Sequence, residues 1–449
     1  MKKAVLKVSK EFECDVFVCG GGTAGIAAAI NAARNGAKVI LADNNGYLGG
    51  TATAGMIGTF MTCMDVSGEN QIIRGFFSEF VDEMIKEGGA ISYLNCRGND
   101  SYSGYRDKGH IGVTPYDYEC FKRVAEKMCI KAGVKLIYNA TLVGCDAENG
   151  KVKCAYLGLK DGIYCINSKV FVDTTGDGAL SYFAGAKWEY GNENGEIQAS
   201  SLFYTISGVD KELLDKHMKD SKDMRDKFYM DEIVEAREKG EFPCGTYKLR
   251  IYELPNGNWS VNMTQTDEQI NVVDGEAVTE AEISQREQIP AITEFLRKYI
   301  PALKNIKILT SADALGIRES RRIVGDYVLK KEDMVKSTHF DDVIAVCSNF
   351  VDIHLKSRVE YIARESNDNY YIPLRSLIVK DFSNLMVAGR CASADHYVMA
   401  AIRVMPPCFA MGEAAGICAA FASKGNVSVR DVKASRVQAK ILENGGYLE

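Results

Sequence analysis

Residues 14–55 read CDVFVCGGGTAGIAAAINAARNGAKVILADNNGYLGGTATAG, and this stretch decides the fold. An apolar run at 16–19 enters a glycine turn at 20–25, and an alanine-rich stretch follows. A second strand-like run at 38–42 ends at Asp43. Because strands, turns and helices each have their own residue pattern, the order predicts a strand, a tight turn, a helix, a second strand and an acid.

Each part of this unit suits the binding of a dinucleotide. Gly20 permits a sharp turn, Gly22 lets backbone N–H groups approach a pyrophosphate, and Gly25 lets the helix lie close to the strand. The helix N-terminus then favours the phosphate charge. Asp43 lies 23 positions after Gly20, close to the roughly 20-residue spacing of an acid that bonds ribose hydroxyls, which argues against a 2′-phosphate. The alternative is a glycine-rich turn in a βαβ unit that binds nothing.

The segment after Asp43 distinguishes between nicotinamide and flavin cofactors. Residues 44–55 form a loop of small residues, where a nicotinamide enzyme normally continues into another helix and strand. With its GYLGGTATAG segment, the chain resembles the FAD-dependent oxidoreductase family, which belongs to the glutathione-reductase-like two-domain flavoproteins and is related to the succinate/fumarate reductase flavoprotein group. The resemblance implies FAD, whereas the spacing alone indicates only a dinucleotide.

Further segments extend the pattern. A helix is predicted over 116–132, a strand over 135–138 and three more strand-like pieces between 140 and 172. The last piece enters Thr175-Gly176-Asp177-Gly178, which resembles the second glycine motif of two-dinucleotide-fold flavoproteins. Residues 315–325 and 371–377 also resemble the family.

The C-terminal block supplies a second group of signals. Residues 384–388 read as a buried strand that Gly389-Arg390 closes, and Met405-Pro406-Pro407 opens a helix, where proline suits the first turn. Small residues along this helix permit close packing on the first βαβ unit or on a ring system, and its dipole favours negative charge on a flavin. One position departs from the wider superfamily, because Arg390 stands where many relatives have an acid that contacts the ribitol.

These signals predict an α/β fold, with a Rossmann-like FAD-binding domain of parallel sheet, helices and a β-meander, and an inserted α+β substrate domain. Residues 195–305 carry charged helix-like stretches at 211–230 and 279–299 and strand-like pieces at 246–254 and 259–264, with no cofactor motif. The expected boundaries are 12–194, 306–330 and 369–430 for the FAD domain, 195–305 and 331–368 for the substrate domain, and 431–449 for a tail.

Composition narrows the class of protein. The 449 residues, 46% hydrophobic and 25% charged, indicate a globular protein of more than one domain. A net charge of −6 gives no basic surface for nucleic acid. Charged residues interrupt the N-terminus before a signal sequence develops, and residues 406–422 are too short and too polar a stretch for an expected membrane span. A cytoplasmic protein without membrane partners is therefore expected. The fourteen cysteines include no CxxC pair, so no metal site is expected.

Four residues are the candidates for catalysis. His396, in the loop between the C-terminal strand and helix, is the first choice as the proton-transfer group, and His354, two residues after Asp352, is the reserve. Arg403 and Arg318 offer planar guanidinium groups for an anionic substrate. The alternatives are a satisfied core or surface histidine, and arginines that form ion pairs between domains. The residues expected to contact the cofactor are Gly20, Gly22, Thr23, Ala24, Gly25, Asp43, Asn44, Gly49, Gly50, Thr51, Gly176, Asp177, Gly389, Arg390 and Pro406.

A functional hypothesis follows from the resemblance. The leading one is an FAD-dependent oxidoreductase that transfers hydride between flavin N5 and a small hydroxy, carbonyl or enoate substrate. With no second GxGxxG motif for a nicotinamide and no CxxC pair, electrons come from the substrate, from a diffusing reductant or from an external donor or acceptor protein. The alternatives are an FAD-bound isomerase or lyase without net redox change, and the flavoprotein subunit of an electron-transfer complex. The oligomeric state is left open.

Overall fold

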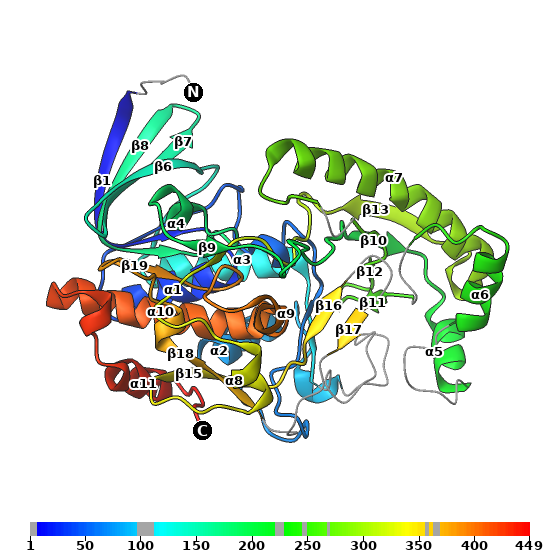
Figure 1. Ribbon diagram of the computed structural model, residues 1–449. Coiled ribbons are helices and arrows are strands. Elements are labelled where there is room, and N and C mark those ends of the chain that lie inside the picture. The colour runs from blue at the N-terminus through cyan, green and yellow to red at the C-terminus, as the bar shows by residue number, and fades with distance from the viewer. Residues whose placement is uncertain are drawn as a thin grey trace.

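The protein is described from a computed structural model, which covers residues 7–96, 112–220, 229–244, 249–266, 270–354, 359–361 and 369–449. A lobe built on a parallel sheet and a lobe built on a smaller antiparallel sheet lie side by side (Figure 1). Parts of the helix predicted at 211–230 and of the strand predicted at 246–254 fall outside the described residues.

The predicted βαβ unit is confirmed as β1 (Val8–Cys19), α1 (Thr23–Arg34) and β2 (Val39–Ala42). β1 pairs in parallel with β2, and alternate side chains of β1 enter two different cores, Val16 and Val18 on one face and Phe17 on the other. A strand that is buried on both faces has a continuous apolar sequence, which is why 16–19 shows no alternation.

The same sheet continues on both sides of this unit. β5 (Lys135–Ile137), reached through α3 (Tyr118–Lys131), pairs in parallel with β2, and β8 (Gly162–Asp173) pairs in parallel with β1. β19 (Leu385–Val387) adds to the carboxyl end of β8, whose first half carries the antiparallel meander β6 (Thr141–Glu148) and β7 (Lys151–Leu159). The predicted parallel sheet with a meander is therefore confirmed.

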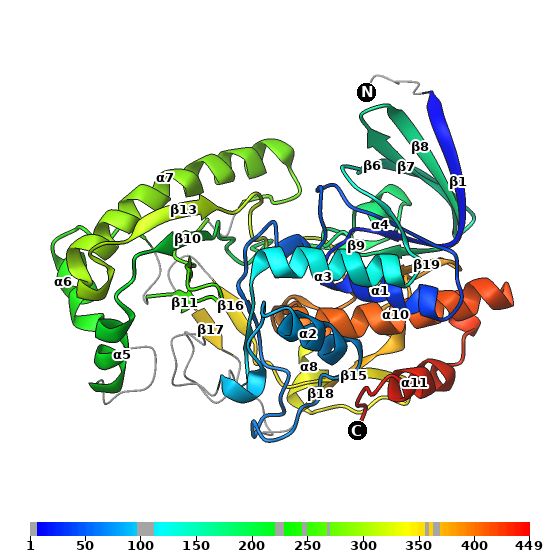
Figure 2. The same cartoon turned by 180° about the vertical axis from the view of Figure 1, so that it is seen from behind.

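Helix α10 (Met405–Gly425) lies beside α1 on one face of this sheet, as both views show (Figures 1 and 2). A Cβ added at Gly412 would lie 2.1 Å from the Ala24 carbonyl oxygen, and one at Gly416 would lie 2.2 Å from the Ala28 oxygen. The small residues therefore serve close helix packing. The helix is longer and more apolar than predicted, because its length and composition alone would allow it to cross a membrane. However, 89% of its most apolar window is buried in the protein.

The second lobe is built on the strand order β11–β12–β10–β13. Helix α7 starts four residues earlier than predicted, because the Asp274 side chain caps it by accepting the Ala277 N–H at 2.9 Å. The elements of this lobe are β10 (Tyr204–Ser207), α5 (Lys211–Asp220), α6 (Met230–Glu238), β11 (Ile251–Glu253), β12 (Trp259–Val261), α7 (Gly275–Tyr299) and β13 (Lys307–Ser311).

Residues 331–368, expected in the substrate domain, divide between the lobes. β15 (Val343–Cys347) pairs with β18 (Tyr370–Pro373) and contacts α10 and α11 (Ala434–Glu443), whereas β16 (Asp352–His354) and β17 (Val359–Tyr361) lie towards β11 and β12 (Figure 1). The other elements are β3 (Thr59–Phe60), α2 (Phe76–Lys86), β4 (Thr114–Pro115), α4 (Ala179–Phe183), β9 (Trp188–Glu189), β14 (Arg322–Ile323), α8 (Lys331–Val335) and α9 (His396–Ile402).

A buried glutamate joins α10 to two other segments of the first lobe. Glu413 accepts hydrogen bonds from the Phe76 N–H at 3.1 Å and from Asn444 Nδ2 at 2.7 Å. Burial raises the pKa of Glu413 from 4.5 to about 7, against the opposing effect of these hydrogen bonds. Between pH 4.5 and about pH 7 the folded state therefore keeps the Glu413 proton, whereas the unfolded state releases it.

The variant Glu413→Gln is expected to reduce the pH dependence of stability. Below pH 4.5 the raised pKa of Glu413 adds about 3 kcal/mol to the free energy of unfolding. This contribution is lost as the pH rises through about 7. Denaturant unfolding should therefore show that the free energy of unfolding of the variant rises relative to that of the wild type between pH 5 and pH 8. The control Glu443→Gln, at an exposed acid on α11, should show no such gain, and equal pH slopes for Glu413→Gln and wild type would contradict the prediction.

Candidate functional site

One cavity of about 500 Å³ opens at the carboxyl ends of the parallel strands and extends towards the second lobe. Cys19 ends β1, Asp43 follows β2 and Thr174 follows β8, and all three line it. Ligands of open α/β sheets bind at this edge, because the loops there leave the sheet in different directions. The cavity thus begins where the sequence predicts a dinucleotide.

The glycine turn has the geometry that such a ligand requires. Gly20 has a φ of +101°, which favours glycine, and a Cβ on Gly25 would lie 1.9 Å from the Gly20 carbonyl oxygen. A Cβ on Gly22, in contrast, would meet no protein atom within 4 Å, and Gly22 lines the cavity. The free space above Gly22, next to the N-terminus of α1, fits a pyrophosphate group.

Asp43 lies buried at the wall of the cavity. Its carboxylate accepts the Gly21 N–H at 2.6 Å and the Asn45 N–H at 2.8 Å. Burial raises the pKa of Asp43, and the hydrogen bonds from Asn45 and Gly21 oppose this rise. Since each carboxylate oxygen has two lone pairs, the fixed group retains capacity for a ribose hydroxyl.

Arg390, which stands in place of the acid of many relatives, is also fixed at this wall. Its Nη2 lies 2.8 Å from Asp177 Oδ1, and its Nη1 donates to the Ser320 hydroxyl at 2.7 Å. Arg390 and Asp177 both line the cavity, so its wall carries an ion pair.

Most of the residues expected at the cofactor line this cavity. Gly25, Gly49 and Pro406 do not, because Gly25 packs against Gly20, Gly49 is bonded to the Gly21 carbonyl, and the neighbouring Val404 and Met405 form the wall at the start of α10. The residues that do are Gly20, Gly22, Thr23, Ala24, Asp43, Asn44, Gly50, Thr51, Gly176, Asp177, Gly389 and Arg390.

Both predicted arginines line the far part of the same cavity. Arg318 donates to the Ser201 hydroxyl at 3.0 Å and to the Ala199 carbonyl oxygen. Arg403 donates to Gln198 Oε1 at 3.1 Å and to the Asp352 carbonyl oxygen at 3.4 Å. Within the part of the chain that the structure describes, Arg403 has no carboxylate partner and its buried Nε has no hydrogen bond. Neutral oxygens therefore bind the buried guanidinium directly, and the carboxylates of Asp352 and Glu319 act on its charge only from a distance.

His354, the reserve candidate, also lines this part of the cavity. Its Nε2 lies 2.8 Å from Asp352 Oδ2, and its Nδ1 lies 3.3 Å from Arg250 Nη1. Burial lowers the pKa of His354 to about 3, with Asp352 opposing the shift and Arg318 and Arg250 adding to it. At neutral pH the imidazole is therefore uncharged, with Nε2–H donating to Asp352 and the Nδ1 lone pair facing Arg250.

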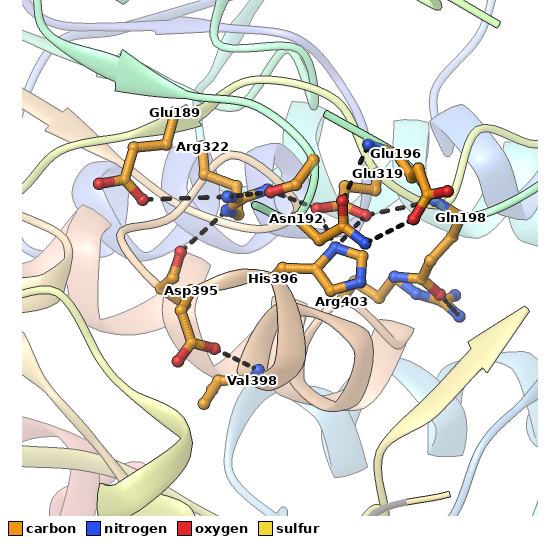
Figure 3. A network of polar contacts seen from close by, with 12 residues as sticks. Glu189, Asn192, Glu196, Gln198, Glu319, Arg322, Asp395, His396, Val398 and Arg403 are labelled. Atoms are coloured by element: carbon orange, nitrogen blue, oxygen red, sulfur yellow. Dashed lines mark hydrogen bonds and ion pairs between the residues drawn. The ribbon is translucent and has the colours of Figure 1, made fainter. Parts of the chain in front are cut away.

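His396, the first choice, does not line this cavity. Its Nδ1 lies 2.8 Å from a carboxylate oxygen of Glu319 (Figure 3). His396 instead lines a second hollow together with Glu189, Asn192 and Lys331. The sequence placed the whole loop at the cofactor, but His396 begins helix α9, and the helix separates it from Arg403 at the other end. The geometry therefore favours His354 over His396 for proton transfer.

Several further residues that no sequence pattern marks lie at the far end of the cavity. Tyr252 and Asn262 reach it from β11 and the end of β12, and Asn349 from the loop before β16. The buried Asn349 Nδ2 and Asn262 Oδ1 have no partner among the described residues. No motif marks these positions, because they belong to short strands that only the fold brings together. No group of three metal-ligating side chains occurs in the described ranges.

Comparison with known proteins gives a family and one short curated match. The family model described as "FAD dependent oxidoreductase" matches residues 15–441. A segment of 46 residues is 50% identical to 4-oxocyclohex-2-ene-1-carboxylate 5-dehydrogenase of Sinomonas cyclohexanicum, and it spans 10% of this chain and 8% of that protein.

Two solved structures match most of the chain at low identity. A geranylgeranyl bacteriochlorophyll reductase-like protein from Thermoplasma acidophilum is 14% identical, with 96% of this chain and 84% of that chain covered and a TM-score of 0.48. L-proline dehydrogenase from P. horikoshii is 13% identical, with 98% of this chain and 100% of that chain covered and a TM-score of 0.45.

Proposed function

The chain belongs to the FAD dependent oxidoreductase family, and from this premise we propose that it transfers hydride between FAD and a small polar substrate that carries a carboxylate. One observation supports the substrate class above all others. Arg318, Arg403 and the Asp352–His354 pair line the cavity that begins at the glycine turn. An anion-binding group and a proton-transfer pair thus share one space with the cofactor segment.

FAD, when bound, supplies the hydride acceptor or donor. The chain's own residues bind the substrate anion through the Arg403 and Arg318 guanidinium groups and so orient the reacting carbon. When a substrate hydroxyl replaces Arg250 Nη1 at the His354 Nδ1 lone pair, Nδ1 takes the hydroxyl proton, or returns it in the reverse direction, while Asp352 fixes the ring and stabilises the imidazolium that forms.

The arginines connect substrate binding to the state of His354. Arg318 and Arg250 lower the pKa of His354 in the free site. An anion bound at Arg318 offsets part of this field and so raises the pKa of His354 from about 3, while burial, the largest cause of the low pKa, continues to favour the neutral imidazole. Substrate binding would in this way prepare the base.

The short curated match suggests a first compound class. The matched protein's name specifies a six-membered ring with a carboxylate and a ketone. Since the match covers only a small part of either chain, we use it solely to choose test compounds.

We further propose that the protein works in the cytoplasm and exchanges electrons with an external protein.

Anaerobic mixing of the oxidised FAD protein with a compound panel tests the proposal. Hydroxylated or partly saturated cyclohexane carboxylates are expected to bleach the flavin absorbance, whereas the corresponding neutral alcohols and ketones are not. Bleaching by neutral compounds alone would contradict the carboxylate assignment, because the arginines would then have no anion to bind.

NADPH alone is expected to reduce the flavin slowly or not at all. Only one glycine fingerprint with a following acid occurs in the chain, and its residues line the cavity assigned to FAD. Stopped-flow absorbance under anaerobic conditions measures the rate. Rapid reduction by NADPH without another protein would show a nicotinamide site in the chain.

A further inference from the structure

We propose that Gln198, Glu319 and His396 are positioning residues, which form a buried chain that holds Arg403 in the orientation for binding the substrate anion. The inference rests on the proposed function of Arg403. These three residues do not line the substrate part of the cavity. The proposed role explains why His396, at the start of α9, is buried against Glu319.

Glu319 is the centre of this chain (Figure 3). Its side chain is fully buried, and it contacts Arg322 Nη1, His396 Nδ1 at 2.8 Å and the Gln198 N–H at 3.3 Å. A buried carboxylate is stable only when its lone pairs are used. Arg322 compensates its charge, while the histidine and the amide fix its direction.

Gln198 links this centre to the active cavity. Its backbone N–H binds Glu319, and its side-chain Oε1 accepts the hydrogen bond from Arg403 Nη2 at 3.1 Å. The backbone and the side chain of one fully buried residue therefore link Glu319, the centre of the chain, to Arg403 at its end. A neutral acceptor positions the guanidinium without neutralising it, so the charge remains available to a ligand.

The same carboxylate also fixes helix α9 at both ends. His396 is the first residue of α9 and binds Glu319 directly, and Arg403 follows the last residue and is joined to Glu319 through Gln198. Seven residues span about 10 Å at 1.5 Å per residue. A helix held at both ends by one buried group has little freedom to tilt, and Arg403 inherits this rigidity.

Five variants, with Arg403→Ala as the reference for the loss of the anion-binding group, and two probes test the proposal in the FAD-loaded protein. Calorimetric titration with cyclohexanecarboxylate and with neutral cyclohexanone gives the dissociation constants. Gln198→Met removes the acceptor and keeps the length of the side chain, and it is expected to weaken carboxylate binding about tenfold with cyclohexanone binding unchanged. His396→Phe should weaken carboxylate binding about threefold, and His396→Gln, which retains an N–H donor for Glu319, should restore most of it. The control Tyr397→Phe, at the neighbouring position, should leave both constants unchanged.

The outcomes separate the two levels of the argument. If Arg403→Ala leaves carboxylate binding unchanged, or if the wild type binds no carboxylate, the proposed function itself fails. If Arg403→Ala weakens binding and Gln198→Met does not, only the positioning chain is refuted. If Gln198→Met weakens the binding of cyclohexanecarboxylate and of cyclohexanone equally, Gln198 has a general structural role and the inference is also overturned. A crystal structure of Gln198→Met should show the Arg403 guanidinium displaced, and an unmoved guanidinium would count against it.

Discussion

Gly22→Val is expected to give a folded protein that carries no FAD. A Cβ at Gly22 would meet no protein atom within 4 Å, so the larger side chain causes no clash with the fold. It would instead fill the space above the N-terminus of α1, where the pyrophosphate has to approach the backbone. Absorbance at the flavin bands of the purified protein, relative to protein absorbance, measures the loss.

A matched glycine in the same lobe provides the control. Gly144 lies in β6, a Cβ there also meets no protein atom within 4 Å, and the residue does not line the cavity. Gly144→Val should therefore retain full FAD content, because valine suits a strand. A Gly22→Val protein with wild-type circular dichroism and full FAD content would remove the glycine turn from the cofactor site.

His354→Phe is expected to retain FAD and to lose turnover by about 10² to 10⁴, the usual effect of removing a positioned acid or base. The ring fills a similar volume, but neither Nδ1 nor the bond to Asp352 remains. The rate of anaerobic flavin reduction by a compound that the panel identifies measures the effect. Asp352→Asn should also lose turnover, since it removes the stabilising charge and its amide group can hold His354 in the wrong tautomer.

The control for this prediction is His339→Phe, at a histidine that packs against the Tyr371 ring outside the cavity. It should turn over at the wild-type rate. His396→Phe could turn over as slowly as His354→Phe. That result fits the positioning role of His396 only if His396→Gln restores the turnover. A His354→Phe enzyme with wild-type turnover would exclude His354 as the proton-transfer group.

The parts of the fold that depend on local sequence were predictable. The turn at 20–25 and the acid at 43 carry their own steric and electrostatic reasons, so β1, α1 and β2 follow from residues that are neighbours in the chain. The small residues of α10 likewise predict close packing, which the approach of Gly412 to Ala24 demonstrates.

The substrate end of the site was predictable only in part. Arg318, Arg403 and His354, each of which adjoins a motif or a polar pattern, do line the cavity, whereas His396, which was placed there on its loop position and motif context, does not. The short helix α9 turns His396 towards Glu319, and no local pattern shows that turn. Gln198 and Asn262 come from unremarkable segments, which only the tertiary structure brings to Arg403 and the cavity.

A crystal structure of the FAD-loaded protein tests the central claim most directly. The account predicts the pyrophosphate at the Gly20–Gly25 turn and the flavin ring in the part of the cavity that His354 and Arg403 line. Both side chains should reach the space beside the ring within about two hydrogen-bond lengths, roughly 6 Å. A flavin ring that leaves both side chains farther away than this would contradict the account.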